Sequence, residues 1–177
     1  TVATGSDATK NIAHIVLMDN NFNSIPYVVG EGRRVINNIE KSSSLFLMKT
    51  IFTMVLAIVS IIGGNLFPFK SNMMTLLEFV VIGFGSFALS MQPNTNKVKG
   101  KFIGYLFSHA LPGATILLFN VLAFQLIKSF GINFNEITPK MYDTLLVAAL
   151  TFGGTAYFVI ICKPYDMYKT IVTAIIM

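Results

Sequence analysis

The feature that most constrains this chain is a set of four apolar segments, each about as long as a membrane is thick. A helix needs about 20 mostly apolar residues to cross the hydrocarbon core of a bilayer. Segments of that kind cover residues 44–63, 73–91, 102–127 and 141–162, and a fifth apolar run starts near Tyr168 and reaches Met177. The sequence therefore predicts a mainly α, polytopic transmembrane helix bundle with about four full spans and a truncated fifth.

The composition supports a membrane protein and argues against a soluble one. Hydrophobic residues make up 54% of the chain and charged residues 12%, whereas charged residues account for about 25% of an average soluble domain. The lone cysteine, Cys162, excludes an internal disulfide and a cysteine-based metal cluster, and a free cysteine usually packs as a small hydrophobe. We therefore expect the lipid bilayer to be the main partner.

Basic residues gather in alternate loops, which predicts an orientation. The segments before the first span, after the second and after the fourth carry most of them: Lys10, Arg33, Arg34, Lys41, Lys97, Lys99, Lys101, Lys163 and Lys169. The two opposite loops carry fewer: Lys70 in one, and Lys128 and Lys140 with Glu136 in the other. By the positive-inside rule, the N-terminal segment is cytoplasmic. This placement accounts for most of the net charge of +5 without a nucleic-acid partner.

The first 43 residues differ from the rest and predict a small α/β unit. Ser6 or Asp7 is a typical helix N-cap, and the apolar run IVLMD fits a buried strand that ends at Asp19. A turn, NNFNS, follows. From Pro26 onward no clear stop signal appears before the first span, so we expect one helix to run from this unit into the membrane.

The same region carries five ordered motifs: Gly5-Ser6-Asp7, Ala8-Thr9-Lys10, Asp19-Asn20-Asn21-Phe22, Gly30-Glu31-Gly32-Arg33 and Asn37-Asn38-Ile39-Glu40-Lys41. Together they resemble the end of the phosphorylation domain of cation-transporting P-type ATPases. There the pattern is G-[ST]-D-V-A-K, a strand ending D-D-N-F, V-x-E-G-R and an N-N-I/M-K segment leading into the fifth membrane helix. The pieces SLFLMKT and FALSMQPN are most similar to a bacterial subgroup called cation-transporting ATPase E, associated with calcium.

The resemblance covers the whole chain and implies its organisation. Residues 1–43 would be the C-terminal remnant of the HAD-like phosphorylation domain, and residues 44–177 would be pump helices 5 to 8 with the start of 9. The intact pump, an ATP-hydrolysing translocase in the bacterial plasma membrane, would use ATP and Mg²⁺ bound by its upstream remainder. The D-K-T-G-T and T-G-D-G-x-N-D motifs do not occur in this sequence, so no catalytic residue is expected here.

Glu78 is the leading candidate for a cation ligand. A carboxylate in an apolar span costs at least ~2.5 kcal/mol, so it is a functional hypothesis by default. In related calcium pumps the sixth membrane helix carries ligands spaced N-x-x-T-D. Counted back from the shared proline, Pro93, Glu78 falls at the asparagine position, and Val81 and Ile82 replace the other two. The resemblance thus implies a metal ligand at Glu78, and either the cation is bound with fewer oxygens, or it is bound elsewhere, or the ion is a different one.

Three residues of the first span complete the predicted site. The resemblance places Thr50 and Thr53 at the ligand positions of the fifth helix, and a spacing of three puts both on one helix face. Threonine hydroxyls also commonly bond to their own helix backbone, so both roles stay open. Lys49 could neutralise Glu78 as a built-in counter-charge, or it could extend to the membrane interface.

Further residues carry weaker expectations. Gly83 and Gly85 predict either local unwinding of the second span or close helix packing. The resemblance implies that Asp19 and Asn21 lie near the phosphorylation site and shape it without being ligands. Asn120 is more typical of an interhelical hydrogen bond than of a ligand.

Two other functions compete with the pump. One is a small, non-catalytic polytopic membrane protein that acts as an accessory subunit, and the other is an inert fragment of a broken pump gene. The sequence opens at Thr1 without a methionine and stops within an apolar run, so we expect a longer protein. An upstream in-frame D-K-T-G-T motif would favour the pump.

Overall fold

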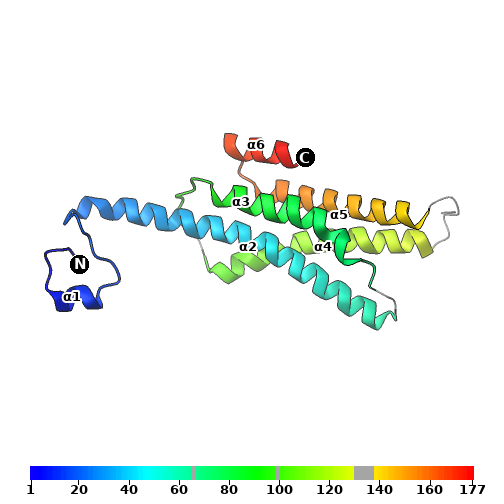
Figure 1. Cartoon of the computed structure of the whole chain (residues 1–177), viewed down its shortest axis with the longest axis horizontal. Helices are drawn as coiled ribbons and strands as arrows, with labels where there is room; N and C mark the ends of the chain where they lie inside the picture. The colour runs from blue at the N-terminus through cyan, green and yellow to red at the C-terminus, as the bar shows by residue number, and fades with distance from the viewer. Residues whose placement is uncertain (65–66, 99, 130–137) are drawn as a thin grey trace. The chain divides into compact units, whose positions relative to one another are not determined.

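The structure is a computed structural model that describes residues 1–64, 67–98, 100–129 and 138–177. It divides into two compact units. The first comprises Thr1–Asn37 and Pro93–Val98, and the second comprises Asn38–Gln92 and Lys99–Met177. Most of the described residues are helical (Figure 1), as the apolar segments predicted.

The first unit begins with a short helix, α1 (Asp7–Ile12). The predicted N-cap is confirmed, because the Ser6 hydroxyl accepts a hydrogen bond from the Thr9 amide. A single 3-10 turn, η1 (Phe22–Ser24), follows, and the Asn21 side chain caps it by accepting from the Asn23 amide. The NNFNS turn therefore forms where it was expected.

The predicted strand over residues 15–19 is wrong. Only an isolated parallel bridge joins Val2 to Leu17, with Ala3 N donating to Leu17 O at 2.9 Å. The part of the chain that the structure describes contains no β-strand, and the α/β unit is not formed. The physical reason is that parallel strands need a sheet buried on both faces. Here Ile15 and Met18 are exposed, and only one short stretch pairs with Leu17.

Helix α2 (Ile25–Ile62) is a single helix of 38 residues, which confirms that the chain enters the first span without a break. Pro26 is tolerated in the first turn because the amide it lacks would be unpaired there. Within the second unit, Leu45, Met48, Phe52 and Leu56 are buried at a spacing of three or four residues. This is the apolar stripe of a helix packed on one side.

The predicted span over residues 73–91 is shorter than expected. It consists of the 3-10 turn η2 (Ser71–Met74), the π-helix η3 (Leu77–Phe84) and the α-helix α3 (Gly85–Ser90). Its apolar helical part, Leu77–Ser90, falls short of a bilayer thickness. Among the described residues, three helices are long and apolar enough to cross a membrane: Phe22–Ile62, Phe102–Ile127 and Lys140–Ile161. The count of four full spans is therefore corrected to three.

The last two long helices, α4 (Phe102–Ser129) and α5 (Pro139–Ile161), lie side by side (Figure 1). Pro112 lies inside α4 without interrupting it. A proline removes one helix hydrogen bond, here the one that the Ser108 carbonyl would accept. The next carbonyl, that of His109, accepts a hydrogen bond from the Tyr157 hydroxyl of α5 at 2.7 Å. Asn120 donates to the Ala149 carbonyl at 3.4 Å, as expected of an interhelical contact.

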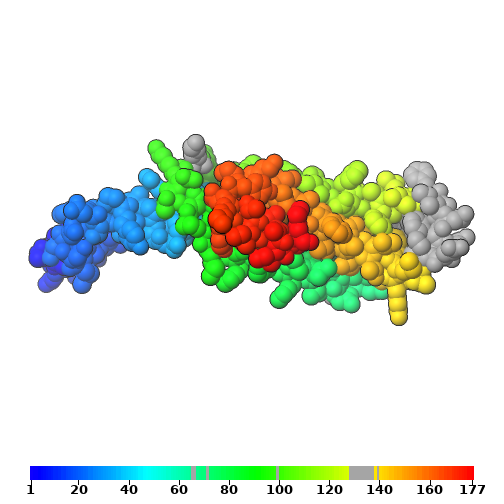
Figure 2. Space-filling view, turned by 90° about the horizontal axis from the view of Figure 1, so that it is seen from above, coloured from blue at the N-terminus to red at the C-terminus, as the bar shows by residue number. Residues whose placement is uncertain are grey.

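Helix α6 (Met167–Ile176) lies at the surface over α3 and α5 (Figures 1 and 2). Glycines allow the helices of this unit to approach closely. A Cβ at Gly113 would lie 2.7 Å from the Met48 sulfur, and one at Gly85 would lie 2.7 Å from the Phe158 ring. The close-packing expectation for Gly85 is thus confirmed.

Candidate functional site

Glu78 and Lys49 form an ion pair between η3 and α2. Both side chains are partly covered, Lys49 with 31% and Glu78 with 46% of its surface exposed. An ionised group in an apolar setting is costly unless it is paired. Lys49 therefore neutralises the carboxylate that made Glu78 anomalous in the sequence.

The backbone around Glu78 is also unusual. Glu78 is the second residue of the π-helix η3, in which each amide bonds to the carbonyl five residues earlier. A Cβ at Gly83 would lie 3.2 Å from the Glu78 carbonyl oxygen, so glycine relieves crowding where the wide turn closes. The segment is not unwound, but π-helical turns occur frequently at functional sites.

Thr50 and Thr53 donate their hydroxyl protons to their own helix. Thr50 bonds to the Phe46 carbonyl at 3.0 Å, and Thr53 to those of Lys49 and Thr50 at 3.0 and 3.1 Å. In the described structure neither hydroxyl is bonded to Glu78. Because a hydroxyl that donates keeps its oxygen lone pairs, both could still act as ligands.

The two apolar positions that follow Glu78 belong to the packed interior. Val81 is fully buried and Ile82 almost so. In the calcium pumps that the sequence resembles, these two positions carry ligands, whereas here both side chains pack in the core. Glu78 is therefore the one carboxylate that η3 offers.

Asp19 and Asn21 organise the turn before α2. Asp19 Oδ1 accepts from the Asn21 amide at 3.1 Å and Oδ2 from the Ser24 hydroxyl at 2.8 Å. The Ser24 hydroxyl and then the Asn21 amide stabilise the charged form and hold the pKa of the Asp19 carboxyl below its usual range. No group of three or more His, Cys, Asp or Glu side chains that could hold a metal occurs among the described residues.

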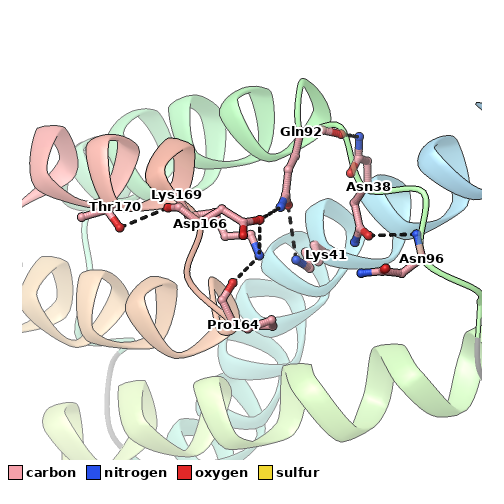
Figure 3. A network of polar contacts seen from close by, with 9 residues as sticks. Asn38, Lys41, Gln92, Asn96, Pro164, Asp166, Lys169 and Thr170 are labelled. Atoms are coloured by element: carbon pink, nitrogen blue, oxygen red, sulfur yellow. Dashed lines mark hydrogen bonds and ion pairs between the residues drawn. The ribbon is translucent and has the colours of Figure 1, made fainter.

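A second polar cluster, which the sequence analysis did not identify, joins α2 to the end of α3 and the start of α6 (Figure 3). Lys41 and Lys169 are only 6% and 2% exposed. Lys41 donates to Gln92 Oε1 at 3.4 Å, and Gln92 Nε2 donates to Asp166 Oδ2 at 3.2 Å. Lys169 donates to the Pro164 carbonyl and lies 3.8 Å from Asp166. The sequence feature that could have indicated this cluster is Lys169, a lysine inside the apolar run 168–177.

The same end of α3 is held by side-chain donors. Asn38 Nδ2 donates to the carbonyls of Ser90 and Gln92 at 2.9 and 2.8 Å. Tyr168 donates to the Ala88 carbonyl at 2.8 Å. The last carbonyls of a helix lack partners within it, so these contacts complete the C-terminal end of α3.

A bundle of apolar helices with an ion pair set between two of them defines a multi-pass membrane protein. Comparison with known proteins identifies the family. The chain is 33% identical over 98% of its length to the calcium-transporting ATPase CtpE of Mycolicibacterium smegmatis, and 31% identical over 95% to the protein of that name from Mycobacterium bovis. It is also 40% identical over 45% of its length to the rabbit (Oryctolagus cuniculus) potassium-transporting ATPase alpha chain 2.

The chain belongs to the cation-transporting P-type ATPases and corresponds to a C-terminal portion of them. It spans 23% of the length of the M. smegmatis protein and 22% of the M. bovis protein. No family model matches the chain, and no solved structure matches it.

Proposed function

We propose that this chain forms part of the ion pathway of an ATP-driven cation pump and that the transported ion is calcium. The membrane helices and the names of the mycobacterial relatives support this proposal. In this proposal residues 1–43 end the HAD-like phosphorylation domain and lie in the cytoplasm. Residues 44–177 supply pump helices 5 to 8 and the start of 9 in a bacterial plasma membrane. ATP and Mg²⁺ bind to the upstream remainder of the pump.

The observation that carries the proposal is the Lys49–Glu78 ion pair. A carboxylate that already has a fixed counter-charge can bind a metal cation only if the cation displaces the lysine ammonium. Lys49 thus sets a threshold for binding and returns to Glu78 when the ion leaves. Thr50 and Thr53, on the same helix as Lys49, add two neutral oxygens to the path.

Calcium needs more ligands than this chain offers. It takes about six to eight oxygen ligands, whereas Glu78 supplies at most two and the two threonines one each. The remaining oxygens would come from the upstream remainder of the pump. In this proposal the chain therefore contributes one side of the binding site.

The test is Glu78→Gln in the intact pump, with ATPase activity measured against calcium concentration. We expect the concentration for half-maximal activity to rise about tenfold or more, because the amide keeps the shape but loses the charge that attracts the cation. Asp143→Asn is the matched control, since Asp143 also pairs with a lysine, Lys70, at 2.8 Å. An unchanged calcium dependence in the Glu78 variant would remove this residue from the site.

A monovalent cation is the second candidate, and two observations favour it. The described part of η3 offers a single carboxylate, already paired with Lys49, and calcium sites usually combine several oxygen ligands with more than one charge. A relative over part of the chain is a potassium-transporting ATPase. Measuring wild-type ATPase activity in potassium without calcium, and the reverse, separates the two ions.

A further inference from the structure

Glu40, on α2, is a buried carboxylate that lacks a hydrogen-bonding partner for one of its oxygens. The residue is only 4% exposed, and no group in the part of the chain that the structure describes donates to its Oε1. The next residue, Lys41, does not fill this role, since its ammonium donates to Gln92 Oε1 at 3.4 Å. An ionised carboxylate in such a setting is costly unless a positive charge or a proton neutralises it.

Helix packing places His109 of α4 beside this carboxylate. Helices α2 and α4 run in the same direction (Figure 1), and they touch where a Cβ at Gly113 would lie 2.7 Å from the Met48 sulfur. Two turns before Met48 on the same face lies Glu40, and one turn before Gly113 lies His109. Because helical side chains tilt toward the N-terminus of their helix, the imidazole extends toward the level of Glu40. The two groups lie close enough to interact electrostatically.

The contacts of His109 leave one ring nitrogen available. Its Nδ1 lies 2.9 Å from the Tyr105 carbonyl oxygen, and a carbonyl only accepts, so this hydrogen bond assigns a proton to Nδ1. The Tyr105 ring stacks on the imidazole with 3.9 Å between ring centroids, and Tyr157 of α5 donates to the His109 carbonyl at 2.7 Å. Both tyrosines are neutral phenols near pH 7. The Nε2 atom is therefore where His109 gains or loses its charge.

We propose that Glu40 and His109 form a proton-binding site that strengthens the contact of α2 with α4 when the pH falls. With a proton on Nε2, the imidazolium supplies the charge that Glu40 lacks. Without that proton, Glu40 is a buried carboxylate that no described side chain neutralises. A proton held on the carboxyl group itself gives the same net charge, so the two groups titrate as a pair.

The position of this pair gives the proton a structural effect. Helix α2 runs from Ile25 through Glu40 to Ile62, so the protonated pair fixes the helix to α4 just before the first predicted span begins, at residue 44. The pair is separate from Glu78 and rests on its own residues. Its failure would leave the proposed ion pathway untouched.

The experiment measures the thermal unfolding of the intact pump in detergent between about pH 8 and about pH 6, the range in which a histidine normally changes charge. Glu40→Gln keeps the shape of the side chain and removes its charge. At pH 8 this variant should unfold about 2 °C or more above the wild type, because the wild type then carries an unneutralised carboxylate. The difference should close or reverse toward pH 6, where His109 is charged. A difference that does not change with pH would overturn the proposal.

Histidine variants test whether His109 is responsible. His109→Gln should lose the gain in unfolding temperature that the wild type shows on acidification, whereas His14→Gln should keep it, since His14 is the other histidine of the chain and is exposed. Loss of the stacking on Tyr105 lowers stability at every pH alike, so only the change with pH reports on the site. Full retention of the acid-induced gain in His109→Gln would overturn the proposal. If that variant does not fold, the comparison with Glu40→Gln still decides.

Discussion

The second unit holds lysines in two different electrostatic settings, and the contrast separates a stabilising contact from an incomplete one. Lys49 is 31% exposed and is matched by the charge of Glu78. Lys41 and Lys169 are more deeply buried, yet they share one outward-lying carboxylate. Burial alone therefore does not predict how much stability is lost when a lysine is replaced. The loss depends on whether the replacement leaves an opposite charge without a partner.

The largest expected effect comes from Lys49→Met, which leaves Glu78 unpaired in apolar surroundings. Breaking a fully buried pair costs about 3–5 kcal/mol. Both partners here are partly exposed, so solvent screening reduces the expected loss to about 2 kcal/mol. Thermal unfolding in detergent measures it, and Lys49→Met combined with Glu78→Leu should recover most of the loss.

The matched change at the other cluster is Lys41→Met, for which the opposite result is expected. Replacing an uncompensated buried charge with an apolar group of similar volume is often neutral or stabilising. The free energy of unfolding should therefore stay within about 1 kcal/mol of wild type, or rise. If both methionine variants lose the same stability, the contrast between the two settings is wrong.

A second prediction concerns the packing that places Glu78 opposite Lys49. A Cβ at Gly154 on α5 would meet Leu77, the residue before Glu78. Gly154→Ala should push on η3 and cost about 1–2 kcal/mol, in the lower part of the range for overpacking a full core. Gly104→Ala on α4 is the control, because nothing lies within 4 Å of its added Cβ.

The activity readout separates overpacking from a shift of the pair. If Gly154→Ala displaces Glu78, the calcium dependence of the intact pump should change in the direction of Glu78→Gln. A variant that is less stable but has a normal calcium dependence would show that the pair does not depend on this contact.

Much of the fold follows from the sequence, because apolar length and local capping are visible in it. The helix across Ile25–Ile62, the span over Phe102–Ile127 and the Ser6 cap were all predicted from local patterns. The predicted strand at residues 15–19 is wrong, because an apolar run forms a strand only if other strands lie beside it, and local pattern carries no information about those neighbours. The π-helix η3 was missed for a related reason: five-residue hydrogen bonding leaves no clear periodic signature in eight apolar residues.

The candidate site was predictable in part. Glu78 stands out in the sequence because a charge within an apolar span is costly. The second polar cluster could not be recognised in the sequence, because its members lie far apart and each looks like an ordinary loop or helix-end residue. These members are Lys41, Gln92, Asp166 and Lys169. Only the packing of α6 at the end of α3 brings them together.

The smallest expected effect is at Asp19, a carboxylate held by hydrogen bonds in an exposed turn rather than by an ion pair in an apolar helix. Its folded pKa lies below the unfolded value because the Ser24 hydroxyl and the Asn21 amide donate to it. A carboxyl with a lowered folded pKa stabilises the fold above its unfolded pKa, about 3.9, and this stabilisation is lost as the pH falls through the folded value. In the intact pump, hydrogen exchange at the amides of Asn21 and Asn23 should accelerate as the pH is lowered through this window, after correction for the intrinsic pH dependence of exchange.

Asp19→Asn should remove that acceleration and leave the Glu78 and Lys49 readouts unchanged, because the turn is stabilised by its own local hydrogen bonds. Asp7→Asn is the matched control, since Asp7 is also exposed and its contact is the weaker one to Lys10 at 3.4 Å. An Asp19→Asn protein that keeps the full acid-induced acceleration would show that the Asp19 hydrogen bonds do not hold the turn.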